Sequence, residues 1–334
     1  MKKIIYIKLF IVLFISCEKA LEIDLPEQES KLVINSFMFS DRFSSPYLSQ
    51  NNVLVSNSIG GLDGFNEYIY TDSLPVIDFA TVSINEQNSV NNIYFEFDKD
   101  CYCYVNRDFI PESNKTYELN VSAPGFPDIK AIETMPTPPQ YIISDFELTG
   151  VLEEDFESHL LKYDLCKLNI TINDNASENN YYRIRIFTGR ENPNGKLMYE
   201  ACYMKTQDPI FLIEPMNRYS TSDTYFEGKN GYFTDALFNG EEKTFFLEVD
   251  KPDTKLEGQW QYIYVEVISY TYNFYKYALT KKEQRRDVGS ILFNSEPVFI
   301  HSNINEGYGI FGGRGISLKA YSPITYPTLG WIEY

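Results

Sequence analysis

The stretch QWQYIYVEVISY (259–270) is the strongest strand signal in the chain. Apolar and polar side chains alternate along it, which predicts a long β-strand with one buried face. The period changes in the next segment, TYNFYKYALTKKEQRRD (271–287). Its apolar residues fall on one helical stripe: Phe274, Tyr275, Ala278 and Leu279. Basic residues come late in this segment, where the helix dipole favours cations, so we expect one helix near 272–286.

Strand signals dominate the sequence on both sides of this stretch. The 27 tyrosines and 24 phenylalanines favour strands, and turn residues separate the alternating segments at short spacing. The expected strands cover residues 31–37, 80–85, 92–97, 101–105, 116–125, 141–148, 165–174, 180–189, 196–204 and 242–250. Residues 38–72 are rich in Ser, Asn and Gly and are expected to form a long loop.

A proline-rich segment, MPTPPQ (135–140), divides the strand signals into two groups, because proline cannot continue a sheet. The sequence thus predicts an all-β protein with two β-sandwich domains, Ig-like or transthyretin-like, at 31–135 and 136–334. The second domain contains the helix.

The chain begins with two lysines and a short apolar run that ends at Ser16-Cys17. This run suits a secretory signal peptide at 1–16 and is too short to span a membrane comfortably. A small residue directly before the cysteine resembles the lipobox of bacterial lipoproteins, which implies that Cys17 is acylated and anchors the chain. The alternatives are a signal peptide without lipidation, with Cys17 an ordinary thiol, and a signal anchor.

Residues 17–30 are acidic and predict a solvated tether. Loss of residues 1–16, which include three lysines, leaves 318 residues and lowers the net charge from −18 to −21. Such an acidic chain argues against nucleic acid as a partner, since nucleic acid attracts clustered Lys and Arg.

Four further cysteines are candidates for disulfides in an exported chain: Cys101, Cys103, Cys166 and Cys202. They allow three pairings, and the sequence does not choose among them. A zinc site from these four is the weaker interpretation, because C-x-x-C spacing is absent and neither histidine is near them in sequence.

Two motifs superficially indicate ligand binding. The glycines of NINEGYGIFGG (303–313) lack P-loop spacing, so we expect close backbone packing there, with Phe311 buried. The stretch INDNASENNYY (172–182) lacks the register of an EF-hand and predicts a turn between strands, with a weak structural Ca²⁺ site as a minor alternative. His159 and His301, the two histidines, lie in no catalytic pattern. We therefore expect no enzyme activity, metal or cofactor.

Several stretches together resemble the Bacteroidota lipoprotein family described as domain of unknown function 4249. They are CEKALEIDLPEQESKLVINSF (17–37), NDNASENNYYRIRIF (173–187), YFTDALFNGEEKTFFLEV (232–249), YNFYKYALTKKEQ (272–284) and PVFIHSNINEGYGIFGG (297–313). The motif residues are Asp174, Asn180, Tyr181, Tyr182, Ser302, Asn303, Gly307, Gly309 and Phe311. The resemblance implies an outer-membrane lipoprotein, often found beside TonB-dependent receptors, without enzyme activity. The acidic tether resembles the surface-export signal of such lipoproteins, the plainer interpretation being a solubilising spacer.

Three functions follow as hypotheses. The first is a surface-exposed lipoprotein that serves as accessory subunit of an outer-membrane β-barrel, of the TonB-dependent transporter type. The second is direct binding of a glycan or peptide, which Trp260, Trp331 and the long loop at 38–72 motivate. The third is a structural subunit of an outer-membrane assembly or biogenesis complex. The sequence identifies no small ligand.

Overall fold

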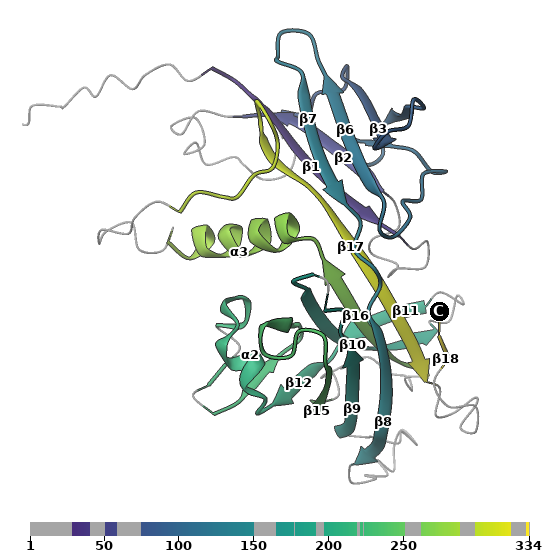
Figure 1. Ribbon diagram of the computed structural model, residues 1–334, viewed down its shortest axis with the longest axis vertical. Coiled ribbons are helices and arrows are strands. Elements are labelled where there is room, and N and C mark those ends of the chain that lie inside the picture. Colours follow the sequence, from purple (N-terminus) through teal and green to yellow (C-terminus); the bar gives the residue numbers. More distant parts are fainter. Residues whose placement is uncertain are drawn as a thin grey trace, which may run out of the picture. The chain divides into compact units, whose positions relative to one another are not determined.

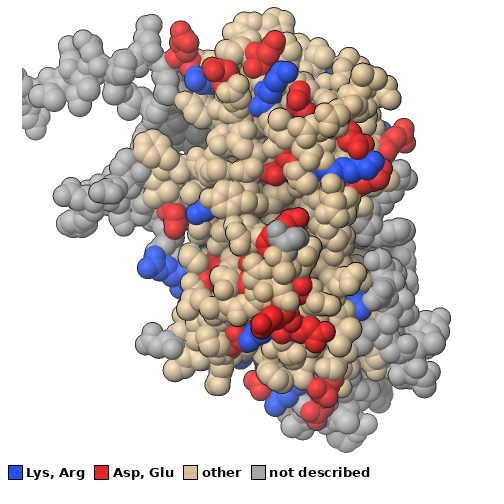
Figure 2. All heavy atoms as spheres, in the orientation of Figure 1, with Lys and Arg blue, Asp and Glu red and all other residues tan. Residues whose placement is uncertain are grey.

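Two β-sheets account for most of the chain that the structure describes (Figure 1). The computed structural model describes residues 29–40, 51–58, 75–149, 165–176, 178–191, 197–218, 221–222, 224–250, 262–287, 298–321 and 332–333. The protein is all-β and sandwich-like, which confirms the predicted fold class. Over the face shown in Figure 2, most lysine and arginine side chains lie beside acidic ones.

The larger sheet has 13 strands among the described residues. Its main path runs β11-β10-β16-β17-β1-β2-β5-β4-β3-β6-β7, with β14 paired to β10 and β18 paired to β17. The strands are β1 (Leu32–Phe39), β2 (Asn52–Asn57), β3 (Thr81–Glu86), β4 (Ile93–Asp98), β5 (Cys103–Val105), β6 (Thr116–Ser122), β7 (Ile129–Thr134), β10 (Tyr181–Glu191), β11 (Leu197–Ala201), β14 (Gly231–Thr234), β16 (Tyr262–Tyr270), β17 (Tyr308–Tyr321) and β18 (Ile332–Glu333).

The smaller sheet has five strands in the order β13-β12-β15-β9-β8. They are β8 (Gln140–Thr149), β9 (Leu165–Asn173), β12 (Tyr203–Thr206), β13 (Phe226–Gly228) and β15 (Glu242–Asp250). The helical elements are α2 (Pro209–Ile213), η2 (Pro215–Asn217), η3 (Asp235–Leu237) and α3 (Tyr272–Asp287).

The first hydrophobic core lies among strands β1 to β7. Along β1, every second side chain is buried from Leu32 to Met38, as the alternating sequence predicts. Phe311, from β17, belongs to the same core and is fully buried. The predicted domain boundary near residue 135 stays a prediction, but this core includes side chains from the far end of the chain.

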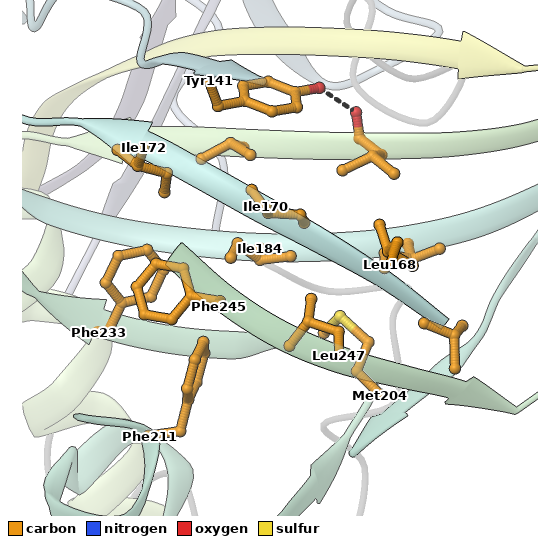
Figure 3. Close-up of a cluster of buried hydrophobic side chains, with 14 of the residues drawn as sticks. Tyr141, Leu168, Ile170, Ile172, Ile184, Met204, Phe211, Phe233, Phe245 and Leu247 are labelled. Atoms are coloured by element: carbon orange, nitrogen blue, oxygen red, sulfur yellow. Dashed lines mark hydrogen bonds between the residues drawn. The ribbon is translucent and has the colours of Figure 1, made fainter. Parts of the chain in front are cut away.

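The second core lies between the smaller sheet and strands β10, β14 and β16 (Figure 3). Phe211, Phe233 and Phe245 pack against one another, with ring centroids 4.8–5.3 Å apart. Tyr141 of β8 crosses the interior, and its hydroxyl donates to the Val265 carbonyl at 2.7 Å. This bond satisfies a buried polar group and ties the two sheets together.

Strand β17 joins the two cores through its two neighbours. Its first half pairs in parallel with β1, and its second half pairs antiparallel with β16. At Gly309 (φ +106°) a Cβ atom would lie 1.8 Å from the Ile34 carbonyl oxygen. Only glycine fits this close approach of backbones, which was the expectation for the glycine-rich motif.

Helix α3 confirms the predicted helix and packs against β17 and η2. Tyr275 donates its hydroxyl to Glu214 at 2.6 Å, beside η2, and Tyr277 donates its hydroxyl to Asn35 of β1 at 2.8 Å. Tyr277 is as buried as Tyr275, although it is outside the predicted stripe. The helix is therefore buried on two sides, which a single-stripe pattern does not predict.

Two strand predictions were wrong in detail. The expected loop at 38–72 contains β2, whose Val53 and Val55 are buried and pair with β1. The expected single strand at 196–204 is two strands in different sheets. The chain crosses between the sheets at Cys202, whose N–H bonds the Ile186 carbonyl at 2.9 Å.

Candidate functional site

Several sequence-predicted residues lie outside the described part of the chain. These are Cys17, the signal peptide and nearly all of the tether, together with His159, Trp260 and Trp331. Within the described residues, none of the helices combines the length and apolar character that crossing a bilayer requires.

The four candidate disulfide cysteines behave as two pairs. Cys101 and Cys103 are joined by a disulfide with an S–S distance of 2.00 Å, in the turn between β4 and β5. Cys166 and Cys202 are buried thiols in the second core. Burial raises the pKa of the Cys202 thiol, so this side chain packs as a neutral, unreactive group.

The Asp174 motif forms a buried network of hydrogen bonds. The Asp174 carboxylate accepts from the Tyr182 hydroxyl at 2.5 Å, from the Gly240 N–H at 2.8 Å and from the Asn180 amide at 3.2 Å. The Asn180 N–H donates to Asp235 at 2.8 Å. We call these five residues the Asp174 network. It holds together the end of β9, the start of β10 and the turns before and after η3.

The acidic groups of this network are in a low-dielectric setting. Burial raises the pKa of Asp235, and the nearby Asp174 charge raises it further. Burial and the bond to Asp174 raise the pKa of Tyr182. The polar groups of the network form hydrogen bonds with one another, so the arrangement favours a structural role. Sequence analysis missed Asp235 and Gly240, although the resemblance included their segment.

The second motif fixes the start of β17. The Asn303 amide donates to the Phe311 carbonyl at 2.7 Å and accepts from the Phe311 N–H at 2.9 Å. Ser302 accepts from the Ile304 N–H at 3.3 Å. Gly307 approaches Leu32, where a Cβ atom would lie 2.7 Å from the carbonyl oxygen. These residues position backbone and have no geometry for chemistry among themselves.

His301 ends a short polar chain at the surface of α3. Its Nε2–H donates to the Asn273 carbonyl oxygen at 2.9 Å, and the Asn273 amide donates to Glu133 at 3.1 Å. Burial and the Lys276 charge lower the pKa of His301, while burial raises the pKa of Glu133. These hydrogen bonds connect α3 to β7. No group of three or more His, Cys, Asp or Glu side chains suited to a metal occurs in the described part of the protein.

A groove of about 560 Å³ lies between β8 and the second half of β17. Residues 138–142 line one side and residues 316–319 line the other. Tyr141 borders the groove, and the Lys319 ammonium lies 5.0 Å from the centre of its ring. Ile142 is 61% exposed beside it. The groove is therefore a mixed apolar and polar surface built on rigid strands.

Two open strand edges border this groove. Among the described strands, β8 is the last of its sheet and pairs on one side only, with β9. On β17, pairing with β1 ends at Arg314 and pairing with β18 begins at Lys319, so residues 315–318 have no strand partner on that side among the described residues. The proline-rich segment at 135–140 is tied to β16, because the Ser269 hydroxyl donates to the Thr137 carbonyl at 2.6 Å. Open edges present unpaired backbone donors and acceptors.

A second groove, of about 610 Å³, lies beside the Cys101–Cys103 turn. Its lining includes Asp98, Asp100 and Asp108, and an ion pair of 2.8 Å joins Asp98 to Arg107. It is more acidic than the groove at β8, and the two strands beside it, β4 and β5, pair with each other. We take the groove between β8 and β17 as the candidate interface.

Comparison with known proteins gives one strong match. A family model described as domain of unknown function (DUF4249) matches residues 18–318. No curated protein matches the chain. A solved structure titled "Structural basis for the promiscuous specificity of the carbohydrate-binding modules from the beta-sandwich super family" aligns at 11% identity, over 72% of this chain and 97% of its own, with a TM-score of 0.16. That score is too low for the likeness to bear on this chain.

Proposed function

This chain belongs to the family described as domain of unknown function DUF4249, and from that premise we propose that it is a non-catalytic, lipid-anchored accessory subunit of an outer-membrane β-barrel. In this proposal Cys17 is the acylated first residue of the mature chain, the protein faces the cell exterior, and its partner is a barrel of the TonB-dependent transporter type.

The groove between β8 and β17 is the observation that carries the proposal. An extended segment of the partner would add as a strand to one of the two open edges, and its alternate side chains would enter the groove. Backbone hydrogen bonds supply affinity in this mode, and the groove side chains supply specificity. Ile142 offers apolar contact, while Glu242 and Lys319 offer one charge of each sign.

The first experiment tests the partner. The tagged chain, purified from gently solubilised membranes, should carry a β-barrel protein with it. Ile142→Lys should lower barrel recovery at least about tenfold, because a lysine at a strand edge opposes strand addition. Phe246→Lys is the matched control, since Phe246 is 67% exposed on the same sheet but lies outside the groove. It should leave recovery unchanged.

The outcomes separate the parts of the proposal. If no barrel is recovered with the native chain, the accessory-subunit function is wrong. If a barrel is recovered equally with both variants, the function stands and the groove is not its interface. Groove-dependent binding of extended peptides without a barrel would instead support direct peptide binding.

The second experiment tests the anchor. Cys17→Ala should move the protein out of the membrane fraction, because the acyl chains supply the membrane affinity. The double variant Cys101→Ala/Cys103→Ala removes cysteines without touching the lipobox and should stay in the membrane fraction. Retention of Cys17→Ala in membranes would contradict the anchor. Protease added to intact cells should digest the native chain, and full protection would contradict its outward orientation.

A further inference from the structure

A cluster of three arginines and one glutamate lies on the face of the larger sheet that points away from the second core; Arg314 and Glu266 are buried, and the other two arginines are partly buried. Arg183 and Arg185 are on β10, Glu266 is on β16 and Arg314 is on β17. In the strand register, Arg185 is opposite Glu266, and Arg314 is opposite Tyr270. We call Arg183, Arg185 and Arg314 with Glu266 the arginine cluster. Sequence analysis missed this cluster. Its signal was the stretch Arg183-Ile184-Arg185, which places two arginines on the same face of a strand.

The charges of the cluster do not balance. Arg185 lies 2.9 Å from the Glu266 carboxylate, and Arg183 lies 3.6 Å from it. The Arg314 guanidinium has no ion pair and no side-chain hydrogen bond in the described part of the chain, and its Cζ atom lies 3.7 Å from the centre of the Phe39 ring. Among the described residues, three guanidinium groups therefore face one carboxylate, which leaves a local charge of +2 in a protein of net charge −18.

The unmatched cation is deeply buried. Arg314 is 6% exposed and Glu266 is 1% exposed. The Nε atoms of all three arginines are buried without a hydrogen-bond partner. An unpaired buried charge is strongly unfavourable, and native proteins normally pair it. Burial lowers the pKa of Arg314 to about 10, and the neighbouring charges of Arg183 and Arg185 lower it as well.

Aromatic residues flank the guanidinium groups, and the Tyr232 hydroxyl accepts a side-chain hydrogen bond from Arg183. Arg183 lies 5.9 Å from the Tyr232 ring and 5.7 Å from the Tyr270 ring, and Arg185 lies 5.1 Å from the Phe187 ring. Stacking uses the flat face of a guanidinium, whereas its N–H groups point outward in the plane. The buried Nε–H donors of the three arginines have no partner and are left for an oxyanion.

We propose that the arginine cluster binds a small oxyanion of charge −2, of the phosphate class. Its charge matches the local excess of +2, and its oxygens accept two bonds at once from a guanidinium fork. Arginines two strands apart on one face reach a common point above the middle strand, because strands are about 4.8 Å apart. Arg314 and Arg185 would donate from opposite sides, and Glu266 would keep the Arg183 and Arg185 side chains in place.

Inorganic phosphate binding by the purified chain tests this site. Phosphate at constant ionic strength should raise the melting temperature of the native protein, and calorimetry should give a saturable 1:1 isotherm. Arg314→Met should melt higher than the native protein without phosphate, because an apolar side chain of similar volume replaces an uncompensated charge. The same variant should weaken phosphate binding at least about tenfold, since it removes a charge-assisted donor.

Arg107→Met is the matched control, because Arg107 is exposed and paired with Asp98. It should change neither the melting temperature nor the phosphate isotherm appreciably. The proposal is overturned if the native protein shows no saturable phosphate binding, or if Arg314→Met binds phosphate as well as the native protein. Neither result bears on the barrel partner, since the assay contains only this chain.

Discussion

Strand β10 borders two buried polar clusters that differ in how their charges are met. At its start, Asn180 and Tyr182 belong to the Asp174 network, where three donors converge on one carboxylate. Directly after it, Arg183 and Arg185 belong to the arginine cluster, where these two arginines share Glu266, Arg314 has no ion pair among the described residues, and the three Nε atoms have no partner. Both clusters contain buried polar groups. They differ because the polar groups of the Asp174 network have hydrogen-bond partners, whereas the arginine Nε atoms do not.

This difference distinguishes a polar network that stabilises the fold from a cluster that can bind a ligand. A buried polar network whose members are all satisfied stabilises one arrangement and leaves nothing to bind a ligand. A cluster with an uncompensated charge is unfavourable by itself and becomes favourable when a counter-ion enters. The family motifs recognised in the sequence fall in the first class, whereas the arginine cluster falls in the second.

Among the substitutions proposed, Glu266→Gln in the arginine cluster should lower the free energy of unfolding the most. It removes the carboxylate that pairs with Arg183 and Arg185, so the free energy of unfolding should fall by about 3–5 kcal/mol without phosphate. Phosphate should then stabilise the variant more than the native protein, because the local excess becomes +3. Urea denaturation with and without phosphate measures both effects.

Glu248→Gln is the control for this change. Glu248 pairs with Lys167 at 3.3 Å on β15, but both side chains are about half exposed. Exposed ion pairs contribute roughly 0–1 kcal/mol, so this variant should unfold almost as the native protein does. Equal effects of the two substitutions would show that the buried position of Glu266 does not matter.

Asp174→Ala should be the next most destabilising change. It leaves the Tyr182 hydroxyl and the Gly240 N–H without their acceptor, at about 1–3 kcal/mol for each donor that stays buried, whereas the Asn180 amide keeps its bond to Asp235. We expect a loss of roughly 3 kcal/mol by denaturant titration. Asp108→Ala, at an exposed position, should stay within about 0.5 kcal/mol of the native protein. Added phosphate should not rescue Asp174→Ala.

Tyr182→Phe should have a smaller effect in the same network. The change removes one hydroxyl and leaves Asp174 with its bonds from Gly240 and Asn180. The free energy of unfolding should fall by about 1 kcal/mol, the usual net contribution of one hydrogen bond. A loss as large as that of Asp174→Ala would mean that the network depends on this one bond.

Local sequence pattern predicted much of the fold because strand alternation and the helix stripe are short-range signals. It located β1, β15, β16 and α3, and it indicated the close packing around Gly309 and Phe311. It could not predict how Arg314 meets Arg183, since β10 and β17 are far apart in sequence and only the strand register brings them near. For the same reason, neither the β8–β17 groove nor the role of Asp235 was predicted.

Asp235→Asn should give the smallest effect, visible as a dependence on pH. Because burial raises the pKa of Asp235 above its unfolded value of about 3.8, the folded protein holds this proton more tightly. The stabilisation that comes from this proton is fully present below the unfolded pKa. It is lost as the pH rises through the pKa of Asp235 in the folded protein. Unfolding measured from pH 3 to pH 7 should therefore increasingly favour the variant over the native protein, whereas a difference that is constant with pH would contradict the raised pKa.

The same reasoning explains why excess buried charge is neutralised in different ways in the two clusters. An excess of buried negative charge is relieved by a proton, as the raised pKa of Asp235 indicates. An arginine holds its proton at any physiological pH, even when burial lowers its pKa to about 10 as in Arg314. The arginine cluster cannot discharge itself at pH 7, so its excess charge calls for an anion from outside the cluster.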